Sequence, residues 1–296
     1  MSAYPLTYIE PVFRPPSEAH SLILQVTNGC SYNECTFCEM YTAPQKTFRP
    51  RKETELLQDI KTAAQFPVRK VFLADGDAMV LSSRRLTRIL QAIAEHMPQV
   101  QRVSAYCLPS NIKNKSVEEL IGLRELGLSL VYVGCESGDD EVLQAVKKGE
   151  TFESSKAALV KLKQAGIKTS VMILNGLGGR QFSQQHARHS AELMNQTQPD
   201  FLSTLVVSFP MGETRFRSGF NGQYEPLSQM ELFQEIRHLI AHLDLEKTVF
   251  RSDHASNYLV LKGILGRDKE KLLNTVDTAI NQPGRIPLRP EWMRGL

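Results

Sequence analysis

The sequence predicts an α/β fold, in which about six strand–helix units form a full or partial parallel barrel and a C-terminal segment caps its mouth. Three observations lead to this prediction. Short apolar runs alternate with longer stretches whose apolar residues recur at helical spacing, as they do in βαβ units. Polar or glycine-rich residues follow each of six such runs. Three cysteines lie within nine residues, shortly after the first run.

The chain is expected to have three parts. Residues 1–21 contain four prolines and are expected to form an extended arm. Residues 22–215 hold the six strand–helix units, and residues 216–296 form the capping extension. At 296 residues, with 42% hydrophobic and 23% charged residues, the composition is that of a globular protein with one large or two small domains.

The six expected strands are short, apolar and rich in β-branched residues, and they lie at residues 22–27, 70–74, 103–107, 128–133, 168–174 and 201–209. The helices expected between and after them lie at residues 53–65, 83–96, 116–126, 140–146, 153–165, 183–195 and 228–242. Strand and helix alternate, which favours a parallel sheet with right-handed crossovers.

The unusual residues of the chain follow the expected strands. These segments are the cysteine loop, Asp75-Gly76-Asp77, Pro109-Ser110-Asn111, Glu136-Ser137-Gly138, residues 175–179 and residues 210–213. In a barrel the carboxyl ends of the parallel strands carry the loops that build the active site. The sequence therefore predicts one active face.

Charge and hydropathy limit the partners. The net charge of +3 is spread along the chain without a long basic run, so no nucleic-acid partner is expected. No run of about 18 apolar residues occurs, so no membrane span is expected. The first ten residues show no secretory signal. Five cysteines without a paired framework suit a reducing cytoplasm and metal binding better than disulfides.

The cysteine loop is the strongest signal of chemistry. Cys30, Cys35 and Cys38 supply three thiolates, whereas an iron–sulfur cluster ordinarily takes four, so one iron would stay open for a ligand. A structural zinc site is an alternative, but no histidine lies near the three cysteines. A plant-type [2Fe–2S] centre would need Cys107 or Cys135, and both lie in strand-like apolar runs.

These residues resemble the radical S-adenosylmethionine (radical SAM) superfamily, in the branch of Elongator-type, methylthiotransferase and coproporphyrinogen-dehydrogenase proteins. The resemblance covers residues 22–209, and its signature is C-x3-C-x2-C with an aromatic residue before the last cysteine. Phe37 is that aromatic residue. The departure is one extra residue between Cys30 and Cys35, which gives C-x4-C-x2-C and which a loop can absorb.

The resemblance implies an oxygen-sensitive enzyme with a [4Fe–4S] cluster held by Cys30, Cys35 and Cys38, whose open iron binds S-adenosylmethionine. Reduction by a donor such as flavodoxin or ferredoxin then cleaves this cofactor to methionine and a 5′-deoxyadenosyl radical, which abstracts hydrogen from a small organic substrate. Two alternatives stay open: the same chemistry on a peptide or protein side chain, and an electron carrier without catalysis.

The resemblance also carries cofactor-binding roles to individual positions, each with a plainer alternative. In the family, the segment at the position of Asp75-Gly76-Asp77 binds the ammonium group in the methionine part of S-adenosylmethionine. The alternative is that these three residues form a simple turn. Glu136 stands near the ribose and methionine part, or is an acid at a helix start. Ser104 and Tyr106 are expected either to line the cofactor pocket or only to pack. Phe37 is the aromatic residue of the motif, and Asn175 and Gly176 lie in the family's adenine-binding segment, where Asn175 is expected to contact cofactor or substrate.

Beyond residue 215 the sequence predicts a glycine- and aromatic-rich loop at 216–224, a short strand at 248–251 and a last helix at 269–280. Arg251, His254 and Asn257 are the candidate catalytic residues of a substrate loop at the barrel mouth. The alternative for this segment is a capped helix start. No second cysteine cluster follows, which argues against sulfur insertion.

Overall fold

The computed structural model describes residues 4–210 and 212–295. Residues 1–3 of the expected arm, Met211 of the expected core and Leu296 of the expected extension lie outside the described residues. The chain divides into two compact units, which are described separately. Unit 1 comprises Met1–Asn33, Cys38–Val133 and Val160–Thr169, and unit 2 comprises Glu34–Phe37, Gly134–Leu159 and Ser170–Leu296.

The strands are β1 (Leu22–Gln25), β2 (Thr27–Asn28), β3 (Arg49–Pro50), β4 (Lys70–Ala74), β5 (Arg102–Cys107), β6 (Leu128–Glu136), β7 (Lys168–Asn175), β8 (Phe201–Val206), β9 (Val249–Ser252) and β10 (Leu261–Ile264). The α-helices are α1 (Glu53–Ala63), α2 (Ser83–His96), α3 (Ser110–Lys113), α4 (Val117–Glu125), α5 (Asp140–Ala145), α6 (Phe152–Gln164), α7 (Gly179–Thr197), α8 (Thr214–Ser218), α9 (Gln229–His242) and α10 (Leu265–Asn281).

Eight strands form a mostly parallel sheet in the order β1-β4-β5-β6-β7-β8-β9-β10, and the division between the units falls within β6. This confirms the predicted α/β class. In unit 1, β1 pairs with β4, β4 with β5 and β5 with β6, all parallel. In unit 2, β7, β8 and β9 are parallel, and β10 runs antiparallel to β9.

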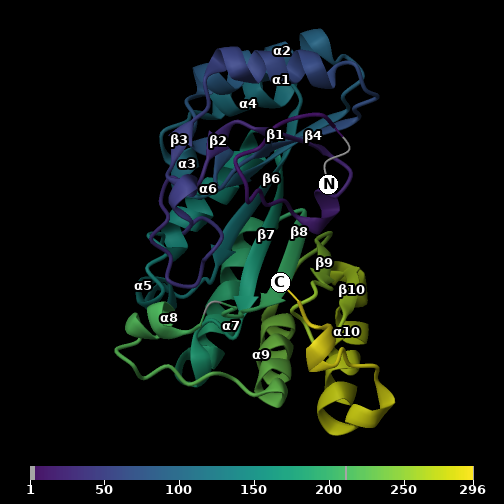
Figure 1. Ribbon diagram of the computed structural model, residues 1–296. Coiled ribbons are helices and arrows are strands. Elements are labelled where there is room, and N and C mark those ends of the chain that lie inside the picture. The colour runs from purple at the N-terminus through teal and green to yellow at the C-terminus, as the bar shows by residue number, and fades with distance from the viewer. Residues whose placement is uncertain (1–3, 211, 296) are drawn as a thin grey trace. The chain divides into compact units, whose positions relative to one another are not determined.

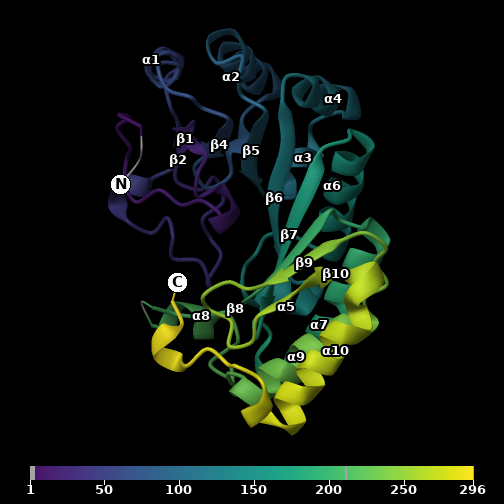
Figure 2. The ribbon, with the colours of Figure 1, turned by 90° about the vertical axis from the view of Figure 1, so that its right-hand side faces the viewer.

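Helix formation in both units follows local sequence signals. Ser82 caps α2 by accepting a hydrogen bond from the Arg85 amide, and the apolar stripe of α2 is buried. Ser116 with Glu119, and Ser228 with Glu231, form capping boxes that begin α4 and α9. In unit 1, α2 packs against α1 and α4 (Figure 1). In unit 2, α9 lies between α7 and α10, and α10 also packs on β10 (Figure 2).

Several boundaries differ from the prediction. The expected strand 22–27 divides into β1 and β2, because Thr27 and Asn28 turn away to pair antiparallel with β3. The expected strand 201–209 ends at Val206, and α7 begins four residues before the expected helix, at Gly179. The sequence analysis did not anticipate α3 or β10.

The expected loop at 216–224 is packed by its aromatic side chains. The helix α8 begins at Thr214, and the rings of Phe216, Phe220 and Tyr224 are buried. The Phe216 ring lies 4.7 Å from Tyr224 and 5.1 Å from Phe220, measured between ring centroids. The burial of three aromatic side chains supplies the apolar area that holds this segment in place.

Candidate functional site

The part of the cysteine loop that belongs to unit 1 is closed at its base by the β2–β3 pairing. The side-chain amide of Asn28 donates to the carbonyl oxygens of Gln45 and Thr47, at 2.7 and 2.9 Å. Gly29 follows with φ +69°, and a Cβ at this position would lie 1.9 Å from the Lys46 carbonyl oxygen. Only glycine meets both demands, so the entry to the loop depends on it.

The residues that follow β4 and β5 anchor the first part of this loop. A Cβ at Gly76 would lie 2.5 Å from the Cys30 Cα, so the two backbones are in direct contact. The Asp77 carboxylate accepts from the Ser31 amide at 2.8 Å and from the Ser31 hydroxyl at 2.5 Å. It also accepts from the Asn111 side chain at 3.0 Å. These bonds engage both oxygens of Asp77, and its predicted contact with the cofactor ammonium stays a prediction.

Asp75 pairs within unit 1. Its carboxylate forms an ion pair with Lys46, and both side chains are completely buried. The Gln25 side chain donates to the same carboxylate at 3.3 Å and also accepts from the Ile9 amide at 2.9 Å. Asp75 therefore helps to fix the N-terminal arm through this network, because a buried carboxylate is stable only with such partners. Its predicted cofactor role stays a prediction.

The predicted pocket residues of β5 lie inside unit 1. Ser104 is fully buried, and its hydroxyl donates to the Val71 carbonyl oxygen at 3.4 Å. The Tyr106 ring lies edge-on to Phe72, with 5.0 Å between ring centroids. Burial raises the pKa of Tyr106 well above its ordinary value, so its hydroxyl stays protonated. Packing accounts for both residues, and their cofactor contacts stay predictions.

In unit 2, Glu136 ends β6 with φ +64°, and its carboxylate lies 3.1 Å from the Lys148 ammonium. A Cβ at Gly134 would lie 2.2 Å from Glu136 Oε1, so the side chain folds back over its own strand. Phe37 packs against the apolar cluster of residues that includes Val142 and Leu174. The ring of this motif aromatic therefore belongs to the core of unit 2.

The end of β7 is held by α9. The Gly176 amide donates to Glu235 Oε1 at 2.5 Å, and the Gly176 carbonyl accepts from the Tyr224 hydroxyl at 3.0 Å. The Asn175 side chain donates to the Leu232 carbonyl at 3.2 Å. The predicted adenine-binding segment is thus fixed through both its backbone and its side chain.

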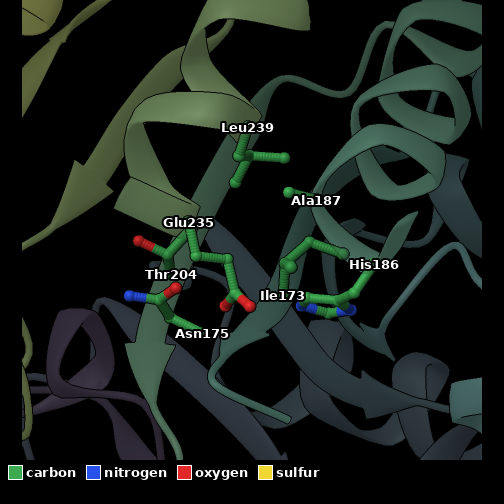
Figure 3. A pocket seen from close by; sticks show the side chains of 7 residues that line it. All are labelled: Ile173, Asn175, His186, Ala187, Thr204, Glu235 and Leu239. Carbon is green, nitrogen blue, oxygen red and sulfur yellow. The ribbon is translucent and has the colours of Figure 1, made fainter. Parts of the chain in front are cut away.

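A small cavity of unit 2 adjoins this segment, and Glu235 points into it beside Asn175 and His186 (Figure 3). Burial raises the pKa of Glu235 to about 7, although hydrogen bonds from Ser183 and Gly176 oppose the shift. This carboxyl group therefore titrates near neutral pH.

His186 forms another wall of the cavity and pairs with a serine. Its Nδ1 lies 2.8 Å from the Ser137 hydroxyl, and its Nε2 lies 3.0 Å from the Leu174 carbonyl oxygen. A carbonyl can only accept, so Nε2 carries the hydrogen and Nδ1 accepts from Ser137. Burial lowers the pKa of His186 to about 4. The pair joins the ends of β6 and β7 as a neutral structural link.

The three candidate catalytic residues lie in β9, for Arg251, and in the loop after it, for His254 and Asn257, and they have different surroundings. Asn257 uses both ends of its amide on β8, accepting from the Val206 amide at 3.0 Å and donating to the Thr204 carbonyl at 2.8 Å. His254 Nδ1 pairs with the Ser256 hydroxyl at 3.0 Å. Arg251 is exposed. Asn257 therefore joins the loop after β9 to β8 through its side chain, and the catalytic roles of all three stay predictions.

The donor set of the cysteine loop fits an iron–sulfur cluster by its chemistry, since it supplies three cysteine sulfurs, at Cys30, Cys35 and Cys38, and none of them is in a disulfide. Within the described residues, no three His, Cys, Asp or Glu side chains stand together as a finished metal site. Cys107 and Cys135 are buried, as expected for packing residues. Burial raises the pKa of Cys135 to about 12, so it is a thiol and a poor fourth ligand.

Sequence reasoning missed several buried ionisable side chains, among them Glu235 and Lys148. Glu235 lies on the apolar face of α9, three residues after Leu232 and four before Leu239, and an acid in that position is a detectable signal. Lys147 and Lys148 are adjacent, and two consecutive lysines are typical of a solvent-exposed segment. Of the two, only Lys148 is buried. No pattern along the chain distinguishes these two lysines.

The chain matches the family model described as the radical SAM superfamily over residues 24–193, which is more than half of its length. The chain belongs to the radical SAM superfamily. As a member of this superfamily it is an enzyme, and its cofactors are a [4Fe–4S] cluster and S-adenosylmethionine. The predicted recognition and cofactors are thereby confirmed.

Relatives lie in the expected branch. A tRNA uridine(34) acetyltransferase of Methanocaldococcus infernus is 24% identical, and the match covers 62% of this chain and 35% of the relative. The chain spans about a third to two-fifths of the curated relatives that it matches.

Solved structures share the fold, and two serve as examples. One is coproporphyrinogen III oxidase (HemN) of Escherichia coli, at 16% identity and a TM-score of 0.55, covering 75% of this chain and 51% of that one. The other is the radical S-adenosylmethionine methyltransferase TsrM of Kitasatospora setae with cobalamin and [4Fe–4S] cluster bound. It has 20% identity and a TM-score of 0.51, and covers 62% of this chain and 36% of that one. Among the described residues of the present chain, no helix is both long and apolar enough to cross a membrane.

Proposed function

We propose that this radical SAM enzyme abstracts a hydrogen atom from a small organic substrate. The cluster would be held by Cys30, Cys35 and Cys38. When bound and reduced, it supplies the electron that cleaves S-adenosylmethionine to methionine and a 5′-deoxyadenosyl radical. The modest, dispersed net charge of +3 supports a small substrate over a nucleic acid.

The observation that carries the proposal is the anchoring of the cysteine loop at the carboxyl end of β4. The loop backbone at Cys30 lies directly on Gly76, and Ser31 is clamped by the Asp77 carboxylate. A loop that served only as a surface turn would not need a buried carboxylate with three donors. Such anchoring suits a loop that must present thiolates in a defined position.

The chain's own residues would do three further things. The fixed backbone at Asn175 and Gly176 would receive the adenine, and Glu136 would accept from hydroxyl groups of the cofactor. The aromatic cluster around Phe216 would keep water from the reacting atoms. Arg251 and His254 would orient the substrate.

The test is anaerobic reconstitution with iron and sulfide, followed by reduction in the presence of S-adenosylmethionine and an assay for 5′-deoxyadenosine. The parent chain is compared with Cys35→Ala and with the matched control Cys107→Ala. We expect product from the parent and the control and none from Cys35→Ala. Cleavage that survives Cys35→Ala would refute the ligand assignment.

A cluster that forms in the parent without any cleavage would favour an electron carrier instead. Once cleavage is established, candidate substrates are screened by incorporation of deuterium from the substrate into 5′-deoxyadenosine. Incorporation from peptides alone, and from no small molecule, would overturn the proposed substrate class.

A further inference from the structure

The middle of the cysteine motif is fastened to the end of α5 within unit 2. The Thr36 amide and the Thr36 hydroxyl both donate to the Val146 carbonyl oxygen, at 2.9 and 3.2 Å. Thr36 is buried, and so is its neighbour Cys35. These two hydrogen bonds to one carbonyl oxygen fix Cys35 relative to the residues that follow Val146.

One of those residues is Lys148, whose side chain is 3% exposed. Its ammonium lies 3.1 Å from Glu136 Oε1 and 5.7 Å from the centre of the Phe37 ring. Both partners suit a cation, the carboxylate by charge and the aromatic face by its quadrupole. Lys148 therefore stands between Glu136 and the Cys35-Thr36-Phe37 segment.

The ammonium keeps its charge in this position. Burial alone would lower the pKa of Lys148, but the charge of Glu136, whose carboxylate lies 3.1 Å from the ammonium, opposes this effect, and the pKa lies above its ordinary value. Glu136 reaches the lysine from a left-handed backbone conformation, φ +64°, and its carboxylate occupies the space over Gly134. A non-glycine residue in this region costs conformational energy. The backbone thus bears strain where it places this ion pair.

We propose that Lys148 is the cationic partner of the cluster ligand Cys35 and, with Glu136 as its counter-charge, raises the reduction potential of the cluster. The inference rests on the proposed binding of the cluster by Cys35. A reduced cluster carries one more negative charge than the oxidised cluster. A nearby buried cation stabilises the reduced state more, because charges interact strongly where water is excluded. The electron itself comes from an external low-potential reductant.

The experiment is a redox titration of the reconstituted full chain, in which the reduced cluster is followed by electron paramagnetic resonance. Lys148→Met removes the charge and keeps an unbranched side chain, so we expect a midpoint potential more negative than that of the parent. Lys148→Arg keeps the charge and should restore the potential. Lys147→Met is the matched control, because Lys147 is adjacent in sequence and its side chain is exposed. This variant should leave the midpoint potential unchanged.

Glu136→Gln should shift the midpoint potential of the cluster in the opposite direction. It keeps the size of the side chain but removes the negative charge, so the potential should become more positive than that of the parent. A purely structural role for the pair would lower iron content in both variants without moving the potentials in opposite directions. If the Lys148→Met variant binds no cluster, the midpoint potentials of Glu136→Gln and Lys148→Arg test the inference instead.

Equal potentials in the parent and the variants would overturn the inference and leave the proposed function intact, provided that the parent cleaves S-adenosylmethionine in the same preparation. A parent that binds no cluster would overturn both.

Discussion

Glu235→Gln tests the surroundings of the β7 terminus through the pH dependence of folding. The pKa of Glu235 is about 7 in the folded chain, against an ordinary value of 4.5, and burial is the main cause. The folded chain therefore holds this proton more tightly than the unfolded chain does. As pH rises from 4.5 to about 7, the unfolded chain releases the proton first, and the free energy of unfolding falls.

The size of this effect follows from the same interval. From 4.5 to about 7, at about 1.4 kcal/mol for each pH unit, the loss is about 3 kcal/mol. Glutamine is neutral at every pH and can still accept from the Gly176 amide through its Oε1. Glu235→Gln should therefore unfold close to the parent near pH 5 and be more stable by up to about 3 kcal/mol at pH 8.

The assay is urea unfolding of the metal-free chain under reducing conditions at pH 5, 6, 7 and 8. The control is Glu270→Gln on α10, which is exposed and should follow the parent at each pH. A stability difference between Glu235→Gln and the parent that does not change with pH would refute the reasoning, since the buried carboxyl would then not titrate in this range.

Three further predictions concern the site and the sheet. Gly76→Ala places a Cβ 2.5 Å from the Cys30 Cα and should abolish cluster incorporation, measured as bound iron after reconstitution, whereas Gly122→Ala meets open space and should keep it. Asp77→Ala removes the acceptor of three hydrogen bonds and should lower bound iron and cost about 3–5 kcal/mol in urea unfolding. Asn257→Ala removes two hydrogen bonds to β8 and should lower the free energy of unfolding by about 2–3 kcal/mol. A variant with full stability that has lost substrate turnover would instead assign Asn257 to catalysis.

Much of the fold could be predicted because local patterns are strong. Apolar runs of five or six residues, such as 70–74 and 103–107, became β4 and β5, and the capping residues Ser116 and Ser228 begin the helices expected there. The predicted strand boundaries were wrong where pairing with a distant segment divides a continuous apolar run. Thr27 continues an apolar stretch in sequence, yet it leaves the strand to pair with β3.

The sequence supplied the candidate ligands of the site, which stay predictions, but it did not show which contacts hold the surrounding loop in place. Asp75 and Asp77 were expected to face the cofactor because of their position after a strand. In the structure one pairs with Lys46 and the other with Ser31 and Asn111. Partners that are 29 to 46 residues away in sequence leave no local trace, so neither pairing could be read from the chain.

The sequence by itself determined the superfamily, the cofactors and the parallel α/β class, because spaced thiolates and alternating periodicities are local properties of the chain. Only the tertiary structure decided which of two adjacent lysines is buried and paired with Glu136, and which glutamate holds the Gly176 amide. The reason is physical. Burial gives a charge its altered pKa and its strong interactions, and burial is set by segments that meet only when the chain has folded.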